Sequence, residues 1–300
     1  MIILIAESKT MTACAESVSP EEYKLHLPTG EVGADEIMAN IAGLNAAELA
    51  SMAKFSGAMA VKALRMAYEF PNKSLGAKAI EAFTGVVFKA FDYSSLDEGE
   101  REIAGESVRL ISSLYGWLRP DDIIKAYRLD FNTALAPGDK PLPADGFYPL
   151  DSDTPFLATG HSALDSDTHF SATGHPALAF DKPMWSFWKR DVTISLVKEI
   201  KERNGEAVLN LLPGDAAKMI DWKLVKNFAK VWKVDFKELS DGGEWKTPTA
   251  NRLKELRGHL LREIVTRKLD SPRDLLALDT DRLLALGTPD YPDHIAFCVK

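Results

Sequence analysis

The 300-residue chain has 46% hydrophobic and 27% charged residues, which is typical of a water-soluble globular protein and excludes disordered or collagen-like chains. Its 36 basic and 44 acidic side chains give a formal net charge of −8, which argues against a protein that coats nucleic acid over its whole surface. The apolar run at residues 2–6 is too short for a membrane span or a signal peptide. Cys14 and Cys298 show no zinc-binding or disulfide spacing. We therefore expect a cytoplasmic protein without a membrane partner.

The first half of the chain begins with a predicted strand and continues into helices. Residues 2–6 are a short β-branched run, which predicts a buried strand that leads into a loop carrying Lys9. From residue 34 to residue 70, apolar side chains recur mostly three or four positions apart. This spacing predicts two or three helices, broken near Gly43 and Gly57.

Two further segments of the first half carry mixed signals. Residues 77–91 contain a short helix followed by the run 86–88, which predicts a strand or a tight hairpin. In residues 100–118, apolar side chains form one helical stripe. This segment therefore predicts a single helix that ends at Gly116.

A tandem repeat interrupts the middle of the sequence. Residues 150–163 and 164–177 are identical at eleven of fourteen positions. Because two copies are too few to bury a shared core, we interpret residues 140–181 as a surface insertion. His161 and His175 occupy equivalent places in the repeat and are weak candidates for metal ligands.

The C-terminal part alternates predicted helices and strands. Asp215 follows a Pro-Gly turn and is a suitable N-cap for a helix running toward Trp222, and Thr249 is a suitable N-cap for a longer helix. The predicted helices of this part span residues 184–203, 215–222 and 250–268. The predicted strands span residues 207–212, 232–239, 244–246 and 294–299.

Basic side chains are concentrated in one part of the sequence. Residues 218–268 hold thirteen basic and seven acidic side chains, a net charge of +6 in a chain whose total is −8. Such polarity is expected where one face meets an anionic ligand such as a phosphate backbone. The loops at Lys9 and at residues 215–218 both follow predicted strands, and each adds a lysine to free backbone N–H groups that favour anions.

No catalytic or cofactor-binding motif is present in the sequence, so no cofactor is predicted and a binding protein is favoured over an enzyme. Lys9 or Lys218 is a candidate electrophile or base if burial lowers its pKa, and Tyr127 is a candidate acid. Arg119 and Arg128 suit bidentate binding of a carboxylate or phosphate. Whether the chain catalyses a reaction therefore stays open.

The central segment resembles a known family. Residues 110–122 read LISSLYGWLRPDD and residues 126–130 read AYRLD, which resembles the run LSGLYGxLRPxDxxxPYRLEM of the YaaA family of bacterial peroxide-stress proteins. Four shorter matches follow in the family's order. Ser8-Lys9-Thr10 is similar to the end of SPAKT, residues 185–188 to LYxFW, residues 208–218 to INLASxEYxK, and residues 254–258 to the AKxARG helix.

This resemblance implies a single compact α+β domain, mixed in helix and sheet, that spans residues 1–300 and carries a basic cleft. It also implies a role in hydroperoxide defence in the bacterial cytosol, with unincorporated iron kept low. Binding to duplex and branched DNA is implied through the cleft and a helix-hairpin-helix-like element near the family motif GxVYxGL. This motif reads GVVFKAF at residues 85–91 here, and INLAS reads LNLLP, with Pro213 in place of a serine.

Three functional hypotheses follow for the same chain. The first is a non-enzymatic stress protein that binds DNA phosphates, with aromatic rings that stack on unpaired bases. The second is an enzyme that acts on a small anionic substrate in the same cleft. The third is a metal binder that uses the histidine repeat, and the sequence predicts no oligomeric state. The expected anion- and DNA-binding residues are Lys9, Thr10, Tyr115, Arg119, Tyr127, Arg128, Trp188, Asp215, Lys218, Lys254 and Arg257.

Overall fold

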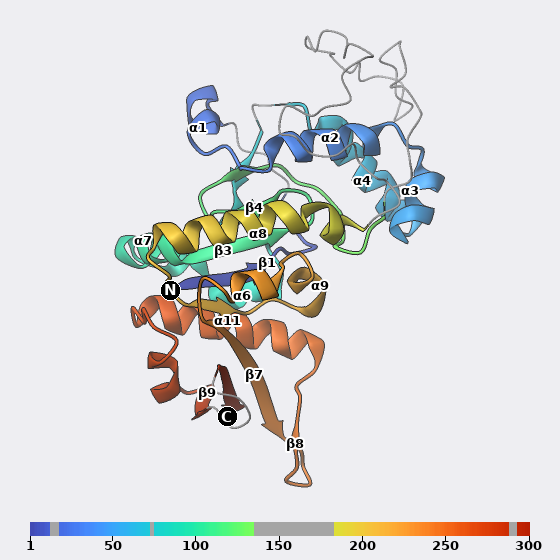
Figure 1. Cartoon of the computed structure of the whole chain (residues 1–300). Helices are drawn as coiled ribbons and strands as arrows, with labels where there is room; N and C mark the ends of the chain where they lie inside the picture. The colour runs from blue at the N-terminus through green and yellow to red at the C-terminus, as the bar shows by residue number, and fades with distance from the viewer. Residues whose placement is uncertain (13–17, 73–74, 135–182, 288–292) are drawn as a thin grey trace.

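The computed structural model describes residues 1–12, 18–72, 75–134, 183–287 and 293–300, and a mixed sheet lies at the centre of this part of the chain (Figure 1). Its strands span Ile2–Ala6 (β1), Val108–Ser112 (β3), Gly116–Leu118 (β4), Val208–Asn210 (β6), Val231–Leu239 (β7), Trp245–Lys246 (β8), Leu283–Gly287 (β9) and His294–Val299 (β10). The strand order is β4-β3-β1-β6-β7-β10-β9, and β8 pairs with β7 outside this path. The five strands from β3 to β10 in this order are parallel, whereas β4, β8 and β9 pair antiparallel with their neighbours.

Strand β1 lies inside the sheet because its sequence is apolar on both faces. All five of its residues are buried, and it pairs in parallel with β3 and with β6. A strand that is covered on both faces has a continuous apolar sequence instead of an alternating one. The carboxyl ends of β1, β3 and β6 therefore meet at one edge of the sheet.

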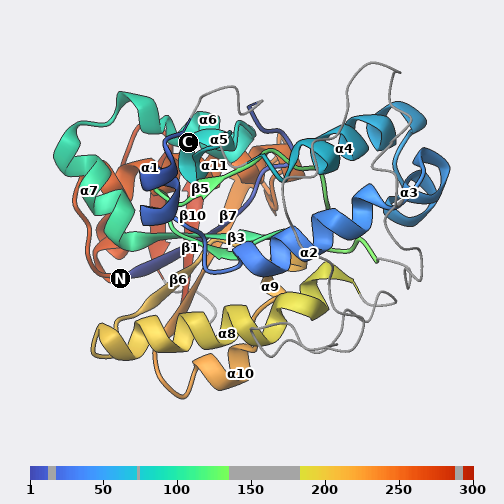
Figure 2. The same ribbon diagram turned by 90° about the horizontal axis from the view of Figure 1, so that it is seen from above.

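Helices cover both faces of this sheet. They span Pro20–Leu25 (α1), Glu31–Ala42 (α2), Ala46–Ala53 (α3), Gly57–Glu69 (α4), Ala79–Ala82 (α5), Val86–Phe91 (α6), Glu98–Ser107 (α7), Met184–Glu202 (α8), Gly214–Ala217 (α9), Trp222–Val225 (α10) and Ala250–Thr266 (α11). Helices α8 and α10 lie on one face, and α6 and α11 lie together on the other (Figure 2). Helices α2, α3 and α4 pack on one another to one side of the sheet. Two short strands, Ala77–Lys78 (β2) and Ile123–Ile124 (β5), pair separately.

Most predicted elements are confirmed, as is the mixed helix-and-sheet fold. Residues 2–6 form β1, and the apolar spacing of residues 34–70 corresponds to the three helices α2, α3 and α4. The predicted long helices are α8 and α11, and Thr249 caps α11 by accepting a hydrogen bond from Arg252 N at 3.4 Å. The predicted C-terminal strands correspond to β6, β7, β8 and β10. The insertion proposed at residues 140–181 lies outside the described residues.

Two predictions in the first half are wrong. The run 86–88 is the first turn of α6 and not a strand or hairpin, and α6 packs against α11. Residues 100–118 do not form one helix, because α7 ends at Ser107 and Val108 begins a strand that pairs with β1. Gly116, at φ +72°, then begins the antiparallel neighbour β4.

The helix predicted from Asp215 toward Trp222 is also divided differently. Pro213 is the N-cap of α9, and Asp215 lies in the first helical turn. Helix α9 ends at Ala217, and α10 begins at Trp222 with a cap of its own. The structure therefore has two short helices where the sequence predicted one.

Helices α6 and α11 approach so closely that only glycine fits between them. A Cβ atom added to Gly258 of α11 lies 2.2 Å from Val87 O and 2.7 Å from Ala90 Cβ in α6. Gly258→Ala therefore forces the helices apart, and overpacking of this kind costs about 1–3 kcal/mol. We expect urea denaturation to show a loss of this size in the free energy of unfolding.

Gly105→Ala in α7 is the matched control for this change. A Cβ atom added to Gly105 meets nothing within 4 Å, and alanine favours a helix over glycine by up to about 1 kcal/mol. This control should therefore be at least as stable as the wild type. Equal stability of the two variants would show that the close approach of the helices is not required.

Candidate functional site

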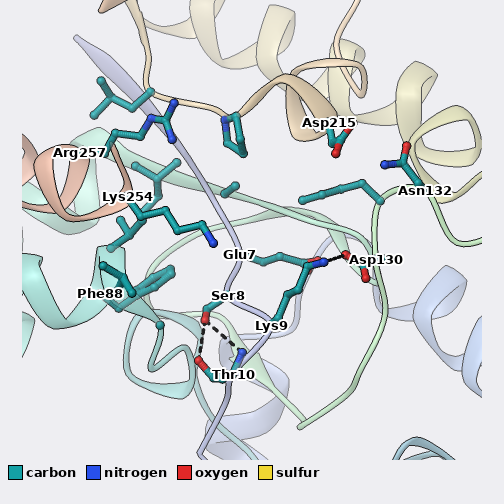
Figure 3. A pocket seen from close by; sticks show the side chains of 18 residues that line it. Glu7, Ser8, Lys9, Thr10, Phe88, Asp130, Asn132, Asp215, Lys254 and Arg257 are labelled. Carbon is teal, nitrogen blue, oxygen red and sulfur yellow. Dashed lines mark hydrogen bonds and ion pairs between the residues drawn. The ribbon is translucent and has the colours of Figure 1, made fainter. Parts of the chain in front are cut away.

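A cavity of about 400 Å³ opens at the carboxyl ends of β1 and β6. In open α/β sheets, ligands bind at this edge because the loops that follow parallel strands meet there. The cavity is also bordered by the start of α6 and by one side of α11 (Figure 3). Besides residues of α11, its lining comes from residues 5–10, 85–88 and 130–132 and from Leu211, Pro213 and Asp215.

Glu7 lines this pocket, and its carboxyl group accepts three hydrogen bonds. Its donors are Ser113 N at 2.8 Å, Ser113 Oγ at 2.6 Å and the hydroxyl of Tyr127. Tyr127 Oη in turn lies 2.7 Å from Ser112 Oγ. The sheet creates this arrangement, because Glu7 follows β1 and Ser113 follows its parallel neighbour β3.

Burial raises the pKa of Glu7 from 4.5 to about 7, although the hydrogen bonds from Ser113 and Tyr127 favour the ionised carboxylate. Glu7 therefore exchanges its proton near neutral pH, as the acid or base of an active site must. Glu7 was not among the site residues predicted from the sequence. The available signal was a carboxylate directly after a buried strand, next to Ser8 and Lys9.

Two lysines that were expected to bind phosphate are paired with carboxylates. Lys9 Nζ forms an ion pair with Asp130, which also lies 3.8 Å from Arg128 Nη2. Lys218 Nζ lies 2.8 Å from Asp215 Oδ1. Hydrogen bonds from Lys218 and from the side chain of Asn132 lower the pKa of Asp215. Because each lysine has an acidic neighbour, both add little net positive charge to the pocket.

Lys254 and Arg257 are the cations on the opposite side of the pocket. They lie one turn apart on α11, and both line the cavity (Figure 3). Neither forms an ion pair with any residue that the structure describes. Arg257 is half-buried, and its burial lowers the pKa of the guanidinium without compensation from a carboxylate. A half-buried cation without a carboxylate partner favours an anionic ligand.

The aromatic residues that were expected to stack on bases lie in the core. Tyr115 is 0% exposed and Trp188 is 2% exposed. Trp188 Nε1 donates to Ser113 O at 3.0 Å, and the hydroxyl of Tyr115 accepts from Lys125 N at 3.0 Å. These rings hold the connection between β3 and β4, and neither presents a face to a ligand.

The other expected residues divide between the pocket and its surroundings. Thr10 lines the pocket, and its backbone N–H donates to Ser8 Oγ at 3.1 Å. Arg119 is exposed away from the lining, and the guanidinium of Arg128 lies over the ring of Phe55 at 5.0 Å. The pocket lining gathers Lys9, Thr10, Asp215, Lys254 and Arg257. It does not include Tyr115, Arg119, Tyr127, Arg128, Trp188 or Lys218, although Tyr127, Arg128 and Lys218 contact residues that do line it. The proposed metal ligands His161 and His175 lie outside the described residues, so that hypothesis stays a prediction.

The fold and the site define a mixed α/β protein with a pocket at the carboxyl edge of its parallel strands, lined by both charged and apolar side chains. Within the described ranges, no helix has the length and apolarity needed to cross a membrane. The sequence matches the family model of "Peroxide stress protein YaaA" over residues 1–148 and 172–284. The chain belongs to this family of peroxide stress proteins.

Similar proteins occur in several bacteria. A UPF0246 protein of Parabacteroides distasonis is 25% identical over 282 residues, which cover 92% of this chain and 91% of the relative. A UPF0246 protein of Phocaeicola vulgatus is 26% identical over 276 residues, or 92% of this chain and 90% of the relative. A third, from Shewanella amazonensis, is 32% identical over 148 residues, or 46% of this chain and 54% of the relative.

Proposed function

We propose that this chain acts in the cytoplasm as a peroxide stress protein that binds DNA and limits the oxidative damage caused by free iron. The observation that carries the DNA-binding part is the pair of cations Lys254 and Arg257, which share one pocket without acidic partners in the described part of the chain. Contacts from lysine and arginine to phosphate supply nearly all of the affinity of non-specific DNA binding. Membership of a family of peroxide stress proteins supports the proposal that this DNA binding serves the response to peroxide.

The geometry restricts how DNA can lie on this surface. A cavity of about 400 Å³ has the size of a small-molecule site, so a duplex can only lie across its mouth. Lys9 and Lys218 already contact carboxylates. We therefore expect α11 to supply the main phosphate contacts and the paired lysines to contribute less.

Fluorescence anisotropy with a labelled duplex tests this proposal at 50–200 mM salt. Each phosphate contact adds about −0.9 to the slope of log K against log salt. We expect the double variant Lys254→Ala/Arg257→Ala to reduce the magnitude of this slope by about two and to weaken binding at low salt at least about tenfold.

Arg190→Ala/Lys198→Ala is the matched control for this experiment. It removes the same charges from exposed positions on α8, which covers the opposite face of the sheet. This control should bind DNA like the wild type. Absence of binding at low salt, binding that ignores salt, or equal losses in both double variants would each contradict the proposal.

Catalysis on a small anionic substrate is the second candidate function. It is favoured by Glu7, whose pKa of about 7 suits proton transfer and which lines the same pocket as Lys254 and Arg257. Among the catalytic candidates named from sequence, Tyr127 contacts this carboxyl group directly. Lys9 is paired with Asp130 and is a weaker candidate for the base.

A further inference from the structure

The two sides of the pocket differ in chemistry. Lys254 and Arg257 lie on the side of α11, and Asp130, Asn132 and Asp215 lie on the opposite side (Figure 3). A ligand that spans the cavity therefore meets, at one end, positive charge that is unpaired within the described residues. At the other end it meets carboxylate and amide oxygens, where the charge of Lys9 is already paired with Asp130. This arrangement fits a molecule with an anionic group at one end and an N–H donor at the other.

Charge compensation within the pocket strengthens this assignment. The carboxylates of Asp130 and Asp215 already have lysine partners, so they need no further cation. Lys254 and Arg257 lack such partners in the part of the chain that the structure describes. An anion at the side of α11 therefore completes the charge balance, while the opposite side remains a hydrogen-bonding surface.

Apolar side chains also line the cavity. Phe88, Leu211 and Pro213 are among them, and they offer no partners to the many hydroxyl groups of a sugar phosphate. They suit a flat heterocycle, which binds through its apolar faces and leaves its polar edge for recognition. A cavity of about 400 Å³ falls within the range for a ligand of this size.

We propose that the pocket binds one nucleotide unit, with its phosphate on Lys254 and Arg257 and the edge of its base facing Asp130 and Asn132. This inference rests on the proposed DNA binding and deepens it, because the same cations hold the phosphate. The unit is either a free nucleoside monophosphate or an unpaired nucleotide of a DNA strand. Both sources present the same phosphate and the same base edge.

Isothermal titration of the full chain tests the pocket with thymidine monophosphate, thymidine and inorganic phosphate. We expect the monophosphate to bind at least about tenfold more tightly than either fragment, because only the monophosphate reaches both sides of the pocket. Arg257→Gln should weaken the monophosphate and inorganic phosphate alike, by about tenfold, because it removes a charge-assisted contact. Equal affinity for the monophosphate and inorganic phosphate would overturn the proposal.

Asn132→Ala separates recognition of the base from recognition of the phosphate. Asn132 is exposed, so this change leaves the core intact. We expect it to weaken the monophosphate about fivefold, the value of one neutral hydrogen bond, and to leave inorganic phosphate unchanged. Lys198→Ala on α8 should change neither affinity. An unchanged affinity of Asn132→Ala for the monophosphate would contradict the placement of the base.

Competition with DNA distinguishes the two sources and separates this proposal from DNA binding itself. If the unit belongs to DNA, a duplex with one unpaired thymidine binds more tightly than a fully paired duplex, and the monophosphate removes that advantage. If the unit is a free nucleotide, the monophosphate binds and the unpaired thymidine gives no advantage. Duplex binding without any monophosphate binding overturns the nucleotide pocket alone, whereas monophosphate binding without duplex binding overturns only the DNA-binding function.

Discussion

Replacing Glu199 with alanine is expected to lower the free energy of unfolding by about 3–5 kcal/mol, because it leaves a buried charge without its partner. Arg109 in β3 is 2% exposed, and its Nε and Nη2 atoms donate to Glu199 of α8 at 2.8 and 2.5 Å. Arg203 Nη2 lies 2.7 Å from the same carboxylate. Urea denaturation followed by circular dichroism measures the loss.

Two further variants test whether the loss of unfolding free energy comes from the guanidinium of Arg109, which Glu199→Ala leaves without its carboxylate partner. Lys198→Ala alters only an exposed pair, in which Lys198 Nζ lies 3.9 Å from Glu202, and it should change stability by less than about 0.5 kcal/mol. Arg109→Met/Glu199→Met removes both buried charges, so it should be more stable than Glu199→Ala. A loss below about 1 kcal/mol in Glu199→Ala would show that Arg109 finds solvent or another partner.

Local sequence patterns predicted elements wherever a segment carries a single dominant signal. Strand β1 and helix α11 are examples, since one has a continuous apolar run and the other has a cap and a helical stripe. Residues 100–118 were misassigned because their apolar positions fit a helix as well as a helix followed by strands. The choice is made by pairing with β1, whose residues lie far away in the sequence. The run 86–88 became helical for the same kind of reason, since α6 packs against α11.

The pocket was predictable only in part. Lys9 and Asp215 were found because they follow strands, and Lys254 and Arg257 were found because they match a family motif. The pairing of Lys9 with Asp130 was not predictable, since it depends on how the chain returns to the sheet edge after β5. The aromatic residues Tyr115 and Trp188 were misplaced for a related reason, because sequence alone does not separate a ring that stacks on ligands from one that fills the core.

The stability of the wild type is expected to fall as the pH rises from about 4.5 to about 7, in part because of Glu7. Its pKa is raised by burial from 4.5 to about 7, so the folded chain keeps a proton that the unfolded chain releases in this interval. The stabilisation is complete below pH 4.5 and is lost as the pH passes 7. At 1.36 kcal/mol for each pH unit, the loss amounts to at most about 3 kcal/mol.

Glu7→Gln removes this contribution and keeps the hydrogen bonds. The amide oxygen can accept from Ser113 N and Tyr127, while the amide nitrogen can donate to Ser113 Oγ. We therefore expect urea denaturation between pH 5 and pH 8 to show a shallower fall of stability for this variant. A slope equal to that of the wild type would mean that Glu7 is ionised throughout this range.

Asp122 supplies the matched control, because burial also raises its pKa, from 3.8 to about 7, in a position outside the pocket. Asp122→Asn should therefore flatten the same stability profile in the same direction as Glu7→Gln. Glu7 lines the same cavity as Lys254 and Arg257, whereas Asp122 does not, so an anion bound at these cations stabilises the protonated form of Glu7 and leaves Asp122 unaffected. Adding thymidine monophosphate should consequently move the titration of Glu7 to higher pH in the Asp122→Asn variant, and no such movement should remain when Glu7 is glutamine.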